Sequence, residues 1–197
     1  MNFIPGRFYH VFNEGNGGAT LFDTGTDDSL VFLSLIRKHL LPHVDIVAYC
    51  LMPTYFHLLL KTDERCLKRC KAGRIEMGVV SCAFKSLLSS HTRIMNKRRG
   101  GYGSLFRQRT RSVCLSHEEA PSYIDEERRS VVLRNVFLQI HDEPVKAGLV
   151  QNPGDWRYSS FQDYAGLRNG TLINKRAALE SGLIAYGESI ILPDSAS

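Results

Sequence analysis

The chain of 197 residues has no uncharged apolar run that approaches the roughly 20 residues needed to cross a bilayer, so its sequence predicts no transmembrane helix. The first residues, MNFIPGRFYHVFNEG, lack the apolar core of a secretory signal, and this predicts a cytoplasmic protein. Cysteine is scarce. The five cysteines are scattered and odd in number, which does not indicate a disulfide framework. Cys66 and Cys70 lack a second pair at zinc spacing, which favours packing over a metal site.

Acidic side chains are missing from the middle of the chain, between Glu76 and Glu118. Eight cations fall in this interval: Lys85, Arg93, Lys97, Arg98, Arg99, Arg107, Arg109 and Arg111. The segment KRRGGYGSLFRQRTR predicts a helix end, a glycine turn and a strand, and on a strand the last three arginines would share one face. Guanidinium groups in such a row bind phosphate oxygens, so the segment predicts a nucleic-acid-binding surface. The alternative is a solvated sheet face or an edge protected by charge.

Predicted strands and helices alternate in the order β-α-β-β-α-β, with another helix behind them. The strands are expected over 7–12, 44–51, 55–61 and 104–114, and the helices over 29–40, 79–96 and 130–141. This order predicts an α+β fold, a ferredoxin-like split βαβ sandwich with one antiparallel sheet, helices on one face and the other face free for a ligand. Residues 1–175 would form the DNA-binding domain, and 176–197 a partly flexible C-terminal extension.

Two local signals refine this expectation. Residues 64–74 predict a short helix or lid between the second hairpin strand and the next helix. Pro144 should end the third helix, since proline lacks the backbone donor and clashes with the preceding turn. Gly148 then suits a left-handed cap.

Three segments carry a resemblance to a known family: AYCLMPTYFHLLLKT at 48–62, QIHDEPVKAGLV at 139–150 and DWRYSSFQDYAG at 155–166. Together they resemble the single-tyrosine HUH transposases, in particular those associated with bacterial repeated extragenic palindromes (REP), and the likeness runs from Phe8 to about Asn174. The resemblance implies strand cleavage and joining through a phosphotyrosine, with Mg or Mn as cofactor. It also implies hairpin or single-stranded DNA as partner, and a homodimer.

The sequence departs from the family at the reacting groups. Aligned on the shared motifs, the first metal-binding histidine is replaced by Tyr55, the second is retained as His57, and the nucleophilic tyrosine is replaced by Gln139. Glu143 occupies the polar metal-contacting position, one helical turn after Gln139. An amide cannot form a phosphotyrosine, and a phenol with an ordinary pKa of about 10 is a poor metal ligand. We therefore expect DNA binding without strand transfer and a weak or absent metal site, with His10 as a replacement ligand if its strand adjoins His57.

Other interpretations stay open. An active transposase with a rearranged centre would need another nucleophile, either Tyr55 or Tyr123, and a repurposed scaffold would use the sheet face to bind a protein. The aromatic residues of 156–164 either stack on unpaired bases or fix the C-terminal segment to the core. The loop GLRNGT at 166–171 either contacts phosphates or is only a turn.

Overall fold

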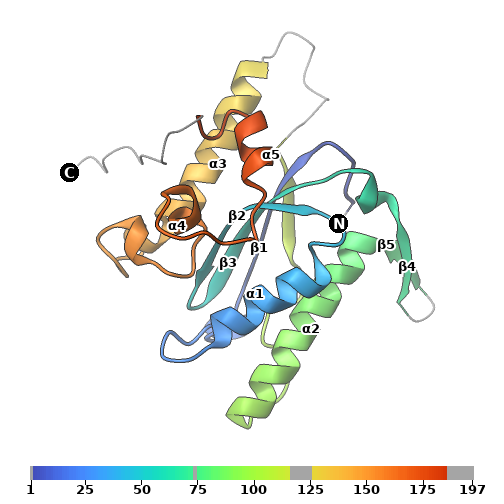
Figure 1. Cartoon of the computed structure of the whole chain (residues 1–197). Helices are drawn as coiled ribbons and strands as arrows, with labels where there is room; N and C mark the ends of the chain where they lie inside the picture. The colour runs from blue at the N-terminus through green and yellow to red at the C-terminus, as the bar shows by residue number, and fades with distance from the viewer. Residues whose placement is uncertain (1, 73–74, 116–125, 186–197) are drawn as a thin grey trace.

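The protein is described here by a computed structural model that covers residues 2–72, 75–115 and 126–185. Its main sheet is antiparallel, with the strand order β2-β3-β1-β6 (Figure 1). The strands are β1 Phe8–Glu14, β2 Asp45–Met52, β3 Tyr55–Lys61 and β6 Arg111–Cys114. The long helices are α1 Asp28–His39, α2 Val79–Arg99 and α3 Glu126–Lys146. The predicted α+β class and antiparallel sheet are confirmed.

Two helices cover one face of the sheet, and α3 lies against the other, which corrects the expectation that the helices share one face and leave the other free. Phe56 of β3 is buried and its ring centroid lies 5.1 Å from that of Phe32 in α1. His91 of α2 packs against the same Phe32 ring. Tyr55, the residue before Phe56 in β3, points to the opposite face and contacts Glu143 of α3. Figure 1 shows α1 and α2 side by side, with α3 across the sheet from them.

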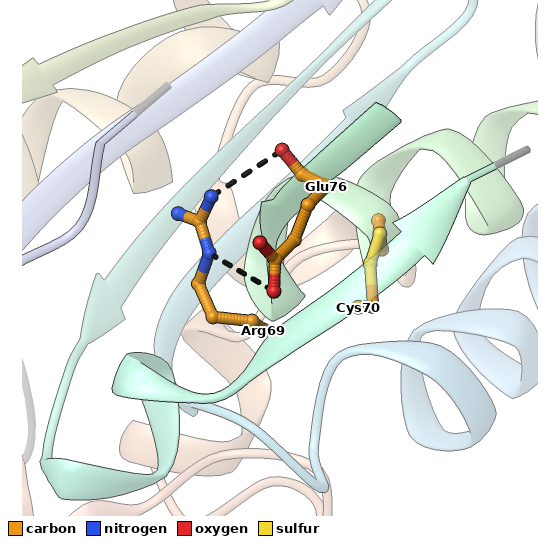
Figure 2. The surroundings of a disulfide bond; sticks show 4 residues. Arg69, Cys70 and Glu76 are labelled. Atoms are coloured by element: carbon orange, nitrogen blue, oxygen red, sulfur yellow. Dashed lines mark hydrogen bonds and ion pairs between the residues drawn. A yellow bond between two sulfur atoms is a disulfide. The ribbon is translucent and has the colours of Figure 1, made fainter. Parts of the chain in front are cut away.

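A two-stranded ribbon precedes α2 in place of most of the predicted helix or lid. Residues Glu64–Leu67 form a single 3-10 turn, and β4 Arg69–Ala72 pairs with β5 Ile75–Gly78. Cys70 forms a disulfide with Cys82 of α2, a pairing that the scattered cysteines of the sequence did not indicate. Figure 2 shows Cys70 beside Arg69 and Glu76. The Arg69 guanidinium donates to the Glu76 carbonyl at 3.3 Å.

The strand predicted over 104–114 is shorter in the structure, because residues 108–110 leave the ladder after Arg107 N–H donates to the Glu14 carbonyl at 2.9 Å. Phe106 bridges to Gly15 and regular pairing resumes only at Arg111. Between these points the buried Asn13 amide donates to the Arg107 carbonyl at 3.1 Å and to Thr110 Oγ1 at 2.9 Å. The Asn13 side chain thus holds both ends of this stretch, and the three arginines do not share one strand face.

The third helix does not end before Pro144, contrary to the prediction, but continues to Lys146. The proline removes one donor within the last turn, while Ala147 N–H still donates to the Glu143 carbonyl at 2.9 Å. Gly148 has φ +67°, as expected for a left-handed cap, and its N–H donates to the Val145 carbonyl. A proline this close to the C-terminal end of α3 therefore reduces the stability of the helix only slightly, and Glu143 remains helical.

The C-terminal segment covers the β2 edge of the sheet. It contains the 3-10 turn Pro153–Asp155 and the short helices α4 Phe161–Tyr164 and α5 Lys175–Glu180. Trp156 Nε1 donates to the Leu51 carbonyl at 3.0 Å, and the Tyr164 hydroxyl donates to the Val47 carbonyl at 2.6 Å. These contacts support the second interpretation of the aromatic residues, in which they fix the segment to the core.

Arg168 of the GLRNGT loop forms hydrogen bonds within the C-terminal segment and to β2. It donates to both carboxylate oxygens of Asp163, at 2.9 and 2.6 Å, and to the Tyr49 hydroxyl at 2.8 Å. Asp163 is 2% exposed and also accepts from Gly170 N–H. Within the described ranges, no helix has the length and hydropathy of a membrane span.

Removing the Asp163 carboxylate should therefore destabilise the protein. Asp163→Ala leaves the Arg168 guanidinium and the Gly170 N–H without their acceptor, and we expect a loss of about 3 kcal/mol in the free energy of unfolding. Urea denaturation measures it. The control is Glu180→Ala, which removes the exposed partner of Arg176 and Lys61 and should change stability by less than about 0.5 kcal/mol. Equal effects of the two substitutions would contradict the prediction.

Candidate nucleic-acid interface

The antiparallel register sets one row of side chains across the face of the sheet that α3 approaches. Cys50 of β2 pairs with His57 of β3, His57 pairs with Phe12 of β1, and Phe12 pairs with Arg111 of β6. The Arg111 guanidinium lies 5.9 Å from the centroid of the Phe12 ring. The retained histidine and the basic segment, about 50 residues apart in sequence, therefore meet on one surface.

Glu143 is the centre of a small hydrogen-bond network at this surface. The Tyr55 hydroxyl donates to its Oε2 atom at 2.9 Å, and the Gln139 amide donates to its Oε1 atom at 3.3 Å. Burial raises the pKa of the Tyr55 phenol, and the neighbouring Glu143 carboxylate raises it further. Tyr55 and Gln139, the two residues predicted at altered positions, are thus brought together on Glu143, and both carboxylate oxygens have protein donors.

His57 forms a second pair, with His10 of β1. The distance from His10 Nε2 to His57 Nδ1 is 2.8 Å, and the two rings are stacked. Burial, followed by the proximity of His57, lowers the pKa of His10 to about 4. Burial also lowers the pKa of His57, although Glu143 opposes that shift. The expected neighbourhood of His10 and His57 is therefore present, and both imidazoles are neutral at pH 7.

The donor set does not fit the Mg or Mn ion that the family resemblance implies. Such ions prefer several oxygen ligands in near-octahedral geometry. Here the Glu143 oxygens accept hydrogen bonds from Tyr55 and Gln139, and His57 Nδ1 is paired with His10. Among the residues that the structure describes, no three His, Cys, Asp or Glu side chains are grouped so as to hold a metal. We derive no chemical step through a metal.

A pocket of about 860 Å³ joins this network to the basic segment. We call it the sheet pocket, and it is lined by Tyr55, His57, Glu143, Arg107, Arg109 and Arg111, among others. Arg107 also forms an ion pair with Glu14 at 2.9 Å, in which both side chains are about half exposed. The three arginines thus reach the same cavity although they do not lie on one strand face.

The other predicted DNA-binding cations divide into two groups. Arg98 and Arg99 pair with Asp27 and Asp28 and join the end of α2 to the start of α1. They do not line the sheet pocket, so these ion pairs compete with their assignment to DNA. Lys97 and Arg93 are exposed on α2. Tyr123 lies outside the described residues.

These features define a ferredoxin-like α+β domain with a basic pocket on the face of its sheet that α3 approaches. No protein-family model matches the chain, and no curated protein matches it. Among solved structures the chain is similar to a REP-associated tyrosine transposase bound to a REP hairpin, with a TM-score of 0.57 and 16% identity. The match covers 97% of this chain and 96% of that chain. It confirms the fold expected from the sequence.

The buried histidines predict a loss of stability in mild acid. Burial lowers the pKa of His10 and His91 to about 4 and that of His141 to about 3. Below about pH 6.5 the unfolded chain binds protons that the folded protein does not, so stability is full above pH 6.5 and falls as the pH approaches 4. We expect a decrease on the order of a few kcal/mol.

Thermal melting at pH 7, 6, 5 and 4.5 measures this loss. The fully buried His141 binds Ser160 Oγ through Nε2 at 2.7 Å, and His141→Gln keeps a polar side chain there without the titration. The variant should therefore show a shallower dependence on pH than the wild type. A melting temperature that stays constant from pH 7 to 4.5 would contradict the prediction.

Proposed function

We propose that this chain is a DNA-binding protein of the tyrosine transposase type, which recognises a hairpin or single-stranded DNA and does not join strands through residue 139. The observation that carries the proposal is the sheet pocket, in which three arginines line the same cavity as Tyr55, His57 and Glu143. The structural neighbour, which was solved bound to a REP hairpin, supports DNA as the ligand class.

The pocket offers chemistry suited to a phosphate backbone. Each guanidinium presents a planar fork that can donate two hydrogen bonds to phosphate oxygens. Arg107 is held by Glu14 only in a half-exposed ion pair, which is weak in water, so a phosphate can replace the carboxylate at little cost. The Phe12 ring next to Arg111 adds an apolar surface against which a sugar or base can pack.

The reacting groups support binding without strand transfer. Gln139 supplies an amide where the family has its nucleophilic phenol, and that amide is occupied by Glu143. Strand transfer through this position would need a hydroxyl that attacks the scissile phosphate and forms a phosphodiester with the DNA, and glutamine has none. The homodimer and the Mg or Mn cofactor implied by the resemblance remain predictions.

One observation favours a second candidate function, strand cleavage with Tyr55 as the nucleophile. Its hydroxyl lies 2.9 Å from Glu143, and a nucleophile within hydrogen-bond reach of a base is the usual arrangement for covalent catalysis. The phenolic oxygen would attack phosphorus as the bond from phosphorus to the 3′ oxygen breaks. Glu143 would take the phenol's proton, and the leaving 3′ oxygen would take a proton from water to give a free 3′-hydroxyl. The raised pKa of Tyr55 argues against this, because the phenolate is then rare at pH 7.

Binding to DNA should depend on salt and on the three arginines of the sheet pocket. We expect the wild-type chain to bind a fluorescent DNA hairpin at low ionic strength and to lose affinity as salt rises, by about 0.7–0.9 in the log–log slope per phosphate contact. The triple variant Arg107→Ala/Arg109→Ala/Arg111→Ala should bind at least about tenfold more weakly, with a slope smaller by about 2–3.

The matched control removes three positive charges elsewhere, with Lys38→Ala/Lys175→Ala/Arg176→Ala on the exposed surfaces of α1 and α5. It should bind almost as well as the wild type. The proposal fails if the wild type shows no salt-sensitive binding at low ionic strength, or if both triple variants lose the same affinity.

Incubation with single-stranded DNA should leave no covalent protein–DNA adduct. The assay uses the full chain, hairpin-containing oligonucleotides labelled at either end, and Mg or Mn, followed by denaturing electrophoresis. An adduct formed by the wild type and lost in Tyr55→Phe would overturn the inactive centre and establish the second candidate. The phenylalanine keeps the ring of Tyr55 while removing its hydroxyl, so loss of the adduct reports on chemistry and not on packing.

A further inference from the structure

The ribbon of β4 and β5 lies beside the N-terminal end of α2 (Figure 1). Val79 N–H, at the start of that helix, donates to the Lys68 carbonyl just before β4, at 2.8 Å. The structure describes the ribbon side chains of 69–71 and 76–77, and none of these belongs to the buried core. A short two-stranded ribbon without buried apolar side chains is only marginally stable by itself. The ribbon therefore depends on its connection to α2.

The two faces of the ribbon differ in chemistry. The antiparallel register pairs Cys70 with Met77 and Lys71 with Glu76, and paired residues lie on the same face. Lys71 and Glu76 are exposed, whereas Cys70 and Met77 are partly buried. The sulfur-bearing face is the one joined to α2, through the disulfide from Cys70 to Cys82 (Figure 2). This bond is a covalent link between the ribbon and the helix.

The cysteines of this bond are accessible, unlike two of the other cysteines. Cys70 and Cys82 are partly exposed, while Cys50 and Cys66 are buried thiols. Burial raises the pKa of the Cys50 and Cys66 thiols, so both stay protonated and unreactive. Thiol–disulfide exchange requires that a thiolate reach a sulfur atom, and accessible disulfides are the ones that reductants open most readily. The Cys70–Cys82 bond meets this requirement.

The charges around the two cysteines also favour exchange. Cys82 is the fourth residue of α2, and the first turn of this helix contains no acidic residue. A helix N-terminus favours an anion, and the thiolate anion is the attacking form in exchange. Cys70 lies between the exposed cations Arg69 and Lys71 in β4. Glu76 offsets part of this charge through an exposed ion pair with Arg69 at 4.0 Å, which is weak in water.

We propose that Cys70 and Cys82 are a reversible redox pair, which holds the β4–β5 ribbon on α2 when oxidised and releases the ribbon when reduced. Reduction removes the covalent link and leaves an element with little buried surface, which opens locally more often. The inference does not depend on the proposed function, because it concerns a bond that lies outside the sheet pocket.

The oxidant is a low-molecular-weight disulfide, and oxidised glutathione is the probe. One cysteine thiolate attacks it, forming a mixed disulfide as one glutathione thiolate leaves. The other cysteine thiolate then attacks the protein sulfur of the mixed disulfide, the Cys70–Cys82 bond forms and the second glutathione thiolate leaves. Two cysteines are oxidised, one oxidised glutathione is reduced to two glutathione thiols, and the two protons lost by the cysteines are taken up by these thiols. Excess reduced glutathione drives the same steps backwards.

Limited digestion with trypsin measures the release of the ribbon. The full chain is equilibrated in mixtures of reduced and oxidised glutathione and digested briefly. The peptides are then fully reduced and quantified by mass spectrometry, so that the disulfide does not conceal a cut. Cleavage after Arg69 and Lys71 should be at least about tenfold faster in the reducing mixtures. Cleavage after Arg176 of α5 is the internal reference and should not change. Alkylation of Cys70 and Cys82 should follow the same dependence on the mixture.

Two variants complete the test. Cys70→Ser/Cys82→Ser should be cleaved at the fast rate in every mixture, while the control Cys114→Ser should keep the wild-type dependence. The proposal is wrong if the bond stays closed in the folded protein under excess reduced glutathione and opens only after denaturation, because it is then a static crosslink. It is also wrong if the reduced ribbon is cut no faster than the oxidised one. Should circular dichroism show that the double serine variant is unfolded, the wild-type comparison decides alone.

Discussion

The amide of Asn13 fixes the segment that brings two arginines to the sheet pocket. Its side chain is buried in β1, donates to the Arg107 carbonyl and to Thr110 Oγ1, and accepts from Glu14 N–H at 2.7 Å. A buried amide needs hydrogen-bond partners, and Asn13 finds two of them at the ends of the stretch 107–110. Arg107 and Arg109 of this stretch line the sheet pocket.

One carboxylate joins the two residues that the family resemblance singles out. A half-buried carboxylate such as Glu143 needs a cation or hydrogen-bond donors. Tyr55 and Gln139, aligned with a metal ligand and a nucleophile of the resembled family, both donate to it. Each of its two oxygens therefore accepts a hydrogen bond from within the protein. The result is a polar network on the sheet face that links β3 to α3.

The sequence predicted the long helices and strands, because their apolar residues recur at a regular spacing over the whole element. The hairpin of β2 and β3 and the helices α1 and α2 follow their apolar spacing closely. The β4–β5 ribbon was missed because its four-residue strands alternate too briefly to be distinguished from a turn of helix. The helix through Pro144 and the Cys70–Cys82 bond depend on local cap geometry and on tertiary contact, which one sequence does not display.

The pairing of charged side chains is a second feature that one sequence does not display. In the acid-free interval, Arg98 and Arg99 are balanced by Asp27 and Asp28, which lie 70 residues earlier in the chain, so local composition overstates the basic surface there. Arg111, in contrast, lies on the short edge strand β6. Charge at such an edge discourages pairing with another sheet, and the same guanidinium faces the sheet pocket. Edge protection and phosphate binding were alternatives for the sequence, but in the structure one arginine can serve both.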